Sequence, residues 1–123
     1  MSLEKIQALA EDYIEFLHTL DMSLFDRVFH PGARLCSRQN GNTTDWSLEE
    51  YRQIVLNRPA PKSLGKKKEG RILFIDYLSD CIALVKVHVR AGDNVFNDYL
   101  NLIETENGWQ IIAKTFTLIR IES

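Results

Sequence analysis

The chain has 123 residues, of which 45% are hydrophobic and 26% are charged. This length fits one globular domain over residues 1–123, because a chain of this size can bury roughly two-thirds of its unfolded surface and is too short for two domains. The net charge of -2 at pH 7, with both signs intermixed, gives no electrostatic attraction toward nucleic acid or anionic membranes. A nucleic-acid-binding or membrane-surface module is therefore not expected.

The chain shows no sign of export or membrane insertion. Glu11, Asp12 and Glu15 interrupt the apolar core that a secretory signal would need, and no apolar run approaches the ~20 residues of a membrane span. The two cysteines, Cys36 and Cys81, lie far apart and lack metal-ligand spacing. We expect a soluble, cytoplasmic protein with no metal site and no cofactor.

Two helices are predicted at the start of the chain. Apolar residues recur at helical spacing over residues 3–20. Asp21 is a typical N-cap for a short second helix, which must end near His30 because Pro31 disfavours helical geometry in the residue before it. A first strand over residues 33–39, followed by a turn, is expected next.

The clearest helix start in the sequence is a capping box formed by Ser47 and Glu50. Trp46, which precedes the cap, can pack on Tyr51 as a hydrophobic staple. This third helix should run to about Asn57, because two prolines follow shortly after it. A loop rich in lysine and glycine then leads to the second half of the chain.

From residue 71 onward the apolar period changes to two, which is typical of strands. Four successive strands are predicted, over residues 71–78, 81–91, 95–105 and 109–121. Helices followed by an antiparallel meander indicate an α+β fold. Several strands are apolar on both faces, and three short helices can cover only one face. We therefore expect the other face to form a homodimer with a second copy of the chain.

The chain contains, in this order, the segments Phe29-His30-Pro31-Gly32-Ala33, Trp46-Ser47, Asp98-Tyr99-Leu100-Asn101-Leu102 and Gly108-Trp109-Gln110-Ile111-Ile112-Ala113-Lys114-Thr115-Phe116. Together they resemble the "putative lumazine-binding" branch of the nuclear transport factor 2-like superfamily. The resemblance implies a cystatin-like cone, in which a curved antiparallel sheet wraps around a long N-terminal helix. It also implies a pocket between sheet and helices, and dimers through the outer face of the sheet. Relatives on this fold include ketosteroid isomerase, SnoaL-like cyclases, scytalone dehydratase and non-catalytic binding modules, so the fold does not select a function.

The last two strands each place a charge among large apolar residues, where an unpaired charge would be costly. These charges are Asp98 and Lys114. If the turn between the strands is a three-residue loop with Gly108 in the left-handed conformation, Thr105 pairs with Trp109. Asp98 and Lys114 then share the inner face. A strict two-residue loop would separate them, so the three-residue form is predicted.

A three-residue turn at residues 92–94 would similarly place His88 opposite Asp98, with Lys86 on the same side. One polar cluster of Lys86, His88, Asp98 and Lys114 would result. In one interpretation it floors a pocket, where Asp98 or His88 acts as a general base and Lys114 or Lys86 holds an anionic group. In the other it is a structural ion-pair network that fixes the strand register.

Three functions are consistent with the sequence. The first is a dimeric small-molecule-binding protein, whose ligand the sequence does not identify; a flat aromatic or heterocyclic compound is one candidate. The second is an isomerase, dehydratase or cyclase that uses Asp98 or His88 in acid/base catalysis, and the third is a structural or interaction module with a vestigial pocket. The aromatic residues are mainly core residues, and some of them can line a cavity that stacks a flat ring. The expected pocket residues are Tyr13, Phe16, Phe29, His30, Trp46, Lys86, His88, Asp98, Leu100, Lys114 and Phe116.

Overall fold

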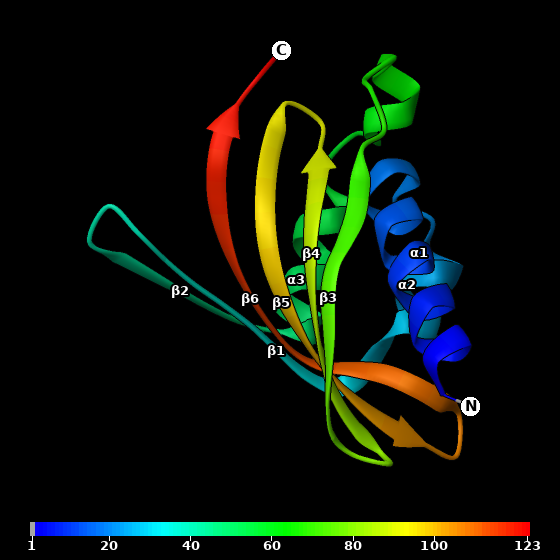
Figure 1. Ribbon diagram of the computed structural model, residues 1–123. Helices are drawn as coiled ribbons and strands as arrows, with labels where there is room; N and C mark the ends of the chain where they lie inside the picture. Colours follow the sequence, from blue (N-terminus) through cyan, green and yellow to red (C-terminus); the bar gives the residue numbers. More distant parts are fainter. Residues whose placement is uncertain (1) are drawn as a thin grey trace.

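The computed structural model describes residues 2–123, which form helices packed on one face of a six-stranded sheet (Figure 1). The helices are α1 (Leu3–Thr19), α2 (Met22–Val28) and α3 (Leu48–Leu56), followed by a 3₁₀ turn, η1 (Pro61–Leu64). The strands are β1 (Phe29–Gln39), β2 (Asn42–Ser47), β3 (Gly70–Ser79), β4 (Ile82–Ala91), β5 (Asn94–Thr105) and β6 (Gly108–Ile121). The fold is α+β, as predicted.

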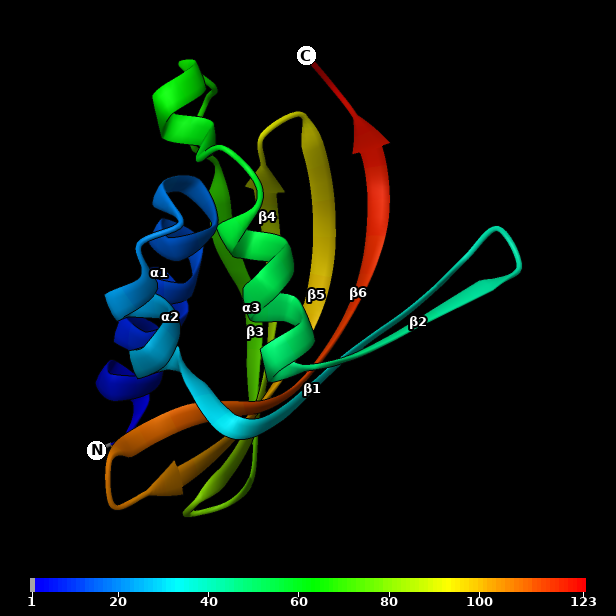
Figure 2. The same cartoon turned by 180° about the vertical axis from the view of Figure 1, so that it is seen from behind.

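The strand order in the sheet is β2-β1-β6-β5-β4-β3. Neighbouring strands are antiparallel except for β1 and β6, which are parallel. The sheet is strongly curved and the helices lie on its concave side, whereas the β1–β2 hairpin extends away from the body (Figures 1 and 2). We call the side that carries the helices the inner face and the opposite side the outer face.

The hydrophobic core fills the space between the inner face and the helices. α1 contributes one apolar stripe to it, and β4 contributes the alternating row Ala83, Val85, Val87 and Val89. Four aromatic rings, those of Phe16, Phe25, Phe29 and Tyr51, pack on one another with centroid distances of 5.2–6.1 Å. Burying each large apolar side chain contributes about 1.5–3 kcal/mol, so this cluster holds the helices on the sheet.

The predicted caps are present at the helix starts. The Asp21 side chain accepts a hydrogen bond from the Ser23 backbone N–H at 2.8 Å. Ser47 Oγ accepts from the Glu50 N–H at 3.1 Å, and Glu50 Oε1 accepts from the Ser47 N–H at 3.0 Å, which completes the capping box. Each cap satisfies N–H groups that have no partner within the helix.

The sequence did not predict β2, and it predicted β1 too short. β2 carries Thr43 and Thr44, which favour strands, but most of its side chains are exposed or half-buried. It lies at the edge of the sheet, where no apolar alternation is needed. β1 begins at Phe29 rather than Ala33, because Phe29 pairs with Ile111 of β6 before a register irregularity that ends at Arg34.

The turn between β5 and β6 differs from the prediction. Thr105 pairs with Gly108, so the loop has two residues and the predicted pairing of Thr105 with Trp109 is wrong. Gly108 nevertheless has a positive φ of 91°. A register shift between Asn101 and Leu102 then leaves Ile112 without a partner in β5.

The unpaired Ile112 forms a β-bulge in β6. On the side of the bulge away from the turn, β5 and β6 pair in the register that the sequence predicted. Beyond it, Leu100 pairs with Lys114 and Asp98 pairs with Phe116. One extra residue in one strand reverses which side chains face inward. Asp98 and Lys114 therefore share the inner face, as predicted, although the loop has the length expected to separate them.

The turn between β4 and β5 is one residue shorter than predicted, and here no bulge compensates. Ala91 pairs with Asn94, so that His88 lies opposite Asn97 rather than Asp98. The predicted pairing of His88 with Asp98 is wrong. Both His88 and Lys86 lie on the outer face, and the predicted four-residue cluster is divided between the two faces of the sheet.

Candidate functional site

A buried triad of Tyr13, Asp98 and Lys114 joins α1 to the inner face of β5 and β6. The Tyr13 hydroxyl donates a hydrogen bond to Asp98 Oδ2 at 2.5 Å, and Lys114 Nζ lies 3.9 Å from the same oxygen. Asp98 is only 2% exposed and Lys114 only 6%. The triad thus holds two opposite charges away from water.

Burial raises the pKa of the Asp98 carboxyl, whereas the charge of Lys114 and the hydrogen bond from Tyr13 act in the opposite direction. Burial also raises the pKa of the Tyr13 hydroxyl well above its ordinary value, and the negative charge of Asp98 adds to this shift. Tyr13 therefore stays a hydrogen-bond donor at neutral pH. Asp98 Oδ1 is buried and has no hydrogen-bond partner among residues 2–123.

Three aromatic rings surround the ammonium group of Lys114. Its Nζ lies 5.1 Å from the ring centroid of Tyr13, 5.4 Å from that of Tyr51 and 5.0 Å from that of Phe116. A cation over aromatic faces is stabilised by about 0.5–2 kcal/mol per contact, more where water is excluded. The rings thus stabilise the charge of Lys114 together with Asp98.

Lys114 lines a cavity of about 80 Å³ between the inner face and the helices, which we call the inner cavity. The Trp46 ring is stacked on Tyr51 and on Phe116, with centroid distances of 5.9 and 6.0 Å and interplanar angles of 17° and 25°. These three rings form a flat aromatic wall. The lining consists of Leu17, Trp46, Tyr51, Arg58, Ala91, Phe96, Lys114 and Phe116.

A second cavity of about 350 Å³, the η1 cavity, adjoins the inner cavity and shares Leu17, Arg58 and Ala91 with it. A salt bridge of 3.1 Å between Lys66 and Asp93 connects the loop after η1 to the β4–β5 turn on its wall. The rest of the lining is Leu20, Pro59, Pro61, Leu64, Gly92 and Asn94. The shared residues place the two cavities next to each other.

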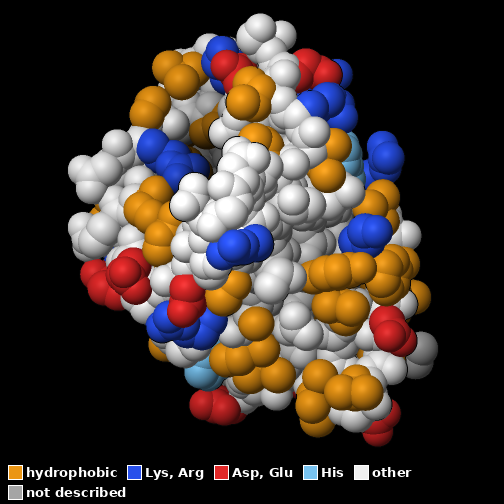
Figure 3. Space-filling model, turned by 90° about the vertical axis from the view of Figure 1, so that its left-hand side faces the viewer, with side chains coloured by type: hydrophobic (Ala, Val, Ile, Leu, Met, Phe, Trp, Pro, Cys, Tyr) orange, Lys and Arg blue, Asp and Glu red, His pale blue; other side chains and the backbone are white. Residues whose placement is uncertain are grey.

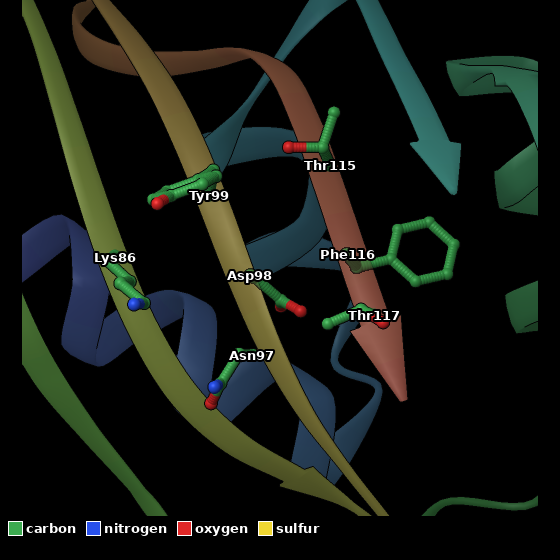
Figure 4. Close-up of a pocket in the computed structure, with 7 residues that line it drawn as sticks. All are labelled: Lys86, Asn97, Asp98, Tyr99, Thr115, Phe116 and Thr117. Atoms are coloured by element: carbon green, nitrogen blue, oxygen red, sulfur yellow. The ribbon is translucent and has the colours of Figure 1, made fainter. Parts of the chain in front are cut away.

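The outer face has a hollow of its own, of about 350 Å³. Its lining consists of Lys86 of β4, Asn97, Asp98 and Tyr99 of β5, and Thr115, Phe116 and Thr117 of β6 (Figure 4). The His88 ring beside it lies 2.8 Å from Asn97 Oδ1 through Nδ1 and 3.5 Å from Glu69 Oε2 through Nε2. His88 is therefore engaged in outer-face contacts.

The structure divides the predicted pocket residues among several places. Trp46, Lys114 and Phe116 line the inner cavity. Asp98 pairs with Lys114 but is not among the residues of that lining. The core buries Tyr13, Phe16, Phe29 and Leu100, the outer face carries Lys86 and His88, and His30 Nδ1 accepts a hydrogen bond from the Gly32 N–H at 2.9 Å.

Sequence reasoning missed Arg58, Leu17, Phe96 and Ala91 as lining residues and treated Tyr51 only as a staple. Leu17 and Tyr51 lie on the apolar stripes of predicted helices, and this position is the signal that could have identified them. Arg58 follows the end of α3 in an irregular segment. No periodicity there shows where its side chain lies.

The arrangement suits ligand binding better than proton transfer. A general base needs a carboxylate oxygen within reach of the substrate, but Asp98 is only 2% exposed and does not line the inner cavity. No group of three metal-ligating side chains lies together among residues 2–123. None of the helices in this part of the chain is long and apolar enough to cross a bilayer.

Solved structures with the same fold are found among nuclear transport factor 2-like proteins. One, an NTF2-like protein of unknown function from Shewanella baltica OS155, is 17% identical with a TM-score of 0.80, covering 98% of both chains. A ketosteroid isomerase-like protein from Erwinia carotovora atroseptica SCRI1043 is 14% identical with a TM-score of 0.74, covering 97% of both. A cystatin-like fold protein from Burkholderia xenovorans LB400 is 14% identical with a TM-score of 0.67, covering 94% of this chain and 90% of the other. These likenesses show the fold.

The profile of the family described as "Putative lumazine-binding" matches residues 1–117. The match includes α1, the aromatic wall and Lys114. No curated protein sequence matches the chain.

Proposed function

The chain belongs to the "Putative lumazine-binding" family, and we propose that it binds a small molecule with a flat ring in the inner cavity. The aromatic wall of Trp46, Tyr51 and Phe116 carries this proposal. These nearly parallel rings give the inner cavity an apolar aromatic lining against which a heterocycle can pack. A pocket that is mostly apolar with a few polar groups is typical of small-molecule sites.

Lys114 supplies the polar group of the inner cavity. An ammonium group has three N–H donors and no acceptor, so it can donate to ring carbonyl oxygens such as those of a pteridinedione. The charge of Asp98, 3.9 Å from Nζ, compensates Lys114 before a ligand arrives. The part of the ligand that lies beside Lys114 therefore needs hydrogen-bond acceptors and no charge.

An isomerase, dehydratase or cyclase using Asp98 is the alternative. The raised pKa of Asp98 favours it, because groups with perturbed pKa values gather at active sites. Structural ion pairs perturb pKa values too, and the contacts of Asp98 with Tyr13 and Lys114 fit that explanation. His88 lies on the other face and provides no second acid or base. Binding without chemistry is the better supported function.

The test uses lumazine as the probe and the two tryptophan indole N–H groups as reporters. Trp46 lines the inner cavity, whereas Trp109 does not. In ¹H–¹⁵N spectra, lumazine should shift the Trp46 indole resonance and leave that of Trp109 in place. The variant Trp46→Leu, which also identifies the resonance, should weaken binding about five-fold, because stacking on one ring is worth about 1 kcal/mol. Shifts confined to the amides of Lys86, Asn97 and Thr115 would contradict the proposal.

A further inference from the structure

Resting on the proposed function, we infer that the ligand also carries a carboxylate, which Arg58 binds where the inner cavity joins the η1 cavity. Arg58 lines both cavities. It lies just beyond the end of α3, which also carries Tyr51 of the aromatic wall. A ligand whose ring packs on that wall therefore lies in the same cavity as the cationic side chain of Arg58, on the side next to the η1 cavity.

Arg58 is the uncompensated charge at this junction. Its side chain makes no ion pair and no hydrogen bond with any of residues 2–123. Arg52, on the same helix, shows the contrast, because it pairs with Asp26 at 2.6 Å and with Glu49 at 3.6 Å. The guanidinium of Arg58 is available to a ligand.

The other charges that line the two cavities have partners. Lys66 is bound to Asp93 at 3.1 Å, and Lys114 lies 3.9 Å from Asp98. The lining thus has an excess of positive charge, although the whole chain has a net charge of -2. This local excess favours an anionic ligand over a neutral or cationic one.

The guanidinium of Arg58 matches a carboxylate in shape as well as charge. A planar guanidinium can donate two parallel N–H···O hydrogen bonds to the two oxygens of a carboxylate. A phosphate dianion would call for a second free cation, and Lys66 is already paired with Asp93. One singly charged, planar acid group therefore fits the junction best.

The test compares two probes that differ in one group, pterin and pterin-6-carboxylate, by calorimetric titration. The wild-type chain should bind the carboxylate about ten-fold more tightly, a difference of about 1.4 kcal/mol. Arg58→Gln should reduce this preference to less than about two-fold, because it removes the group that distinguishes the two probes. The matched control is Arg71→Gln, because Arg71 is an exposed arginine of β3 that lines neither cavity. It should keep the wild-type preference.

The outcomes separate this inference from the proposed function. Equal affinity of the wild-type chain for both probes would overturn the inference and leave the inner-cavity proposal standing. An equal loss of both affinities in Arg58→Gln would also overturn it, because Arg58 would then act on the ring or on the fold. Binding of neither probe would overturn both proposals. Thermal unfolding of each variant checks that it is folded, and Arg58→Lys, which keeps the charge, should retain part of the preference.

Discussion

Lys114 Nζ lies 3.9 Å from Asp98 Oδ2, inside a ring of aromatic side chains and out of contact with bulk water. This pair sets the charge of the inner cavity, since Lys114 lines the cavity and Asp98, which does not line it, compensates the charge of Lys114. The two residues come from neighbouring strands, and they face the same side only because of the bulge at Ile112.

Removing Lys114 should destabilise the fold at alkaline pH. At pH 8, Lys114→Met leaves Asp98 buried without its cation, and we expect a loss of about 3 kcal/mol in the free energy of unfolding. The double variant with Asp98→Asn should cost less than the sum of the two single changes. Urea unfolding of all four proteins measures this coupling, and effects that add within about 0.5 kcal/mol would show that the residues act independently.

The raised pKa of Asp98 predicts how stability depends on pH. The folded protein holds the Asp98 proton to higher pH than the unfolded chain does, from its ordinary pKa of 3.8 upward. The stabilisation from this proton is therefore complete below the unfolded pKa and is lost as pH rises through the folded pKa. The variant Asp98→Asn has no carboxyl group at this position, so this contribution to the pH dependence of its stability is absent.

Urea unfolding of the wild-type chain and of Asp98→Asn between pH 3.5 and 8 checks this sign. The stability of the wild-type chain relative to the variant should fall as pH rises. A relative stability that instead increased with pH would mean that Lys114 and Tyr13 outweigh burial and that the pKa of Asp98 is lowered.

The capping box at the start of α3 should be structural. Ser47→Ala removes the side chain that accepts a hydrogen bond from the Glu50 N–H, and we expect a loss of about 0.5–2 kcal/mol in the free energy of unfolding. Ser123→Ala, at the exposed C-terminal residue, is the control and should change nothing. Weakened lumazine binding without any loss of stability would show that Ser47 belongs to the ligand site instead.

The outer face should form a homodimer. It exposes the apolar side chains of Phe74, Ile82 and Tyr99 around the outer hollow, and Phe74 and Tyr99 pack edge to face at 6.5 Å. From the side that carries the β1–β2 hairpin, hydrophobic side chains gather in groups toward the lower right of the view (Figure 3). Covering such groups with a second copy would remove apolar surface from water.

Sedimentation equilibrium at micromolar concentration tests the dimer. The wild-type chain should run at twice 14.2 kDa, and Tyr99→Glu should run at 14.2 kDa. The control is Tyr77→Glu, because Tyr77 is about as exposed but pairs with Ala83, whose side chain is on the inner face. A wild-type chain that ran only at 14.2 kDa would contradict the prediction.

Local patterns in the sequence predicted the helices, the caps of α2 and α3 and five of the six strands, because each depends on residues close together in the chain. The strand register did not follow from such patterns. The segment around Gly92 is compatible with turns of two or three residues, and a slip of one residue moved His88 to the opposite face. At Gly108 the loop was also shorter than predicted, yet Asp98 was placed correctly because Ile112 bulges from β6. Neither Ile112 nor its neighbours mark that bulge in the sequence.

The inner cavity was only partly predictable for a related reason. Trp46 and Lys114 were predicted as pocket residues because an indole before a helix cap and a lysine among apolar residues are unusual. Arg58 is an exposed arginine that lies between Asn57 and Pro59, just after α3. Nothing in the sequence distinguishes it from other surface arginines. Its place between two cavities comes from the path of the chain through η1, which depends on tertiary packing.

The parallel pairing of β1 with β6 constrains the order in which the chain can fold. Phe29 and Leu35 of β1 have their partners at Ile111 and Lys114, so nearly the whole sequence must be present before this central pair can form. Contacts between residues so distant in sequence slow folding, because the entropy of closing the loop is lost before the contact forms. Until β6 arrives, the hairpin of β1 and β2 has an unpaired edge next to the aromatic core. We therefore expect the docking of β6 to limit the folding rate and to complete the inner cavity in the same step.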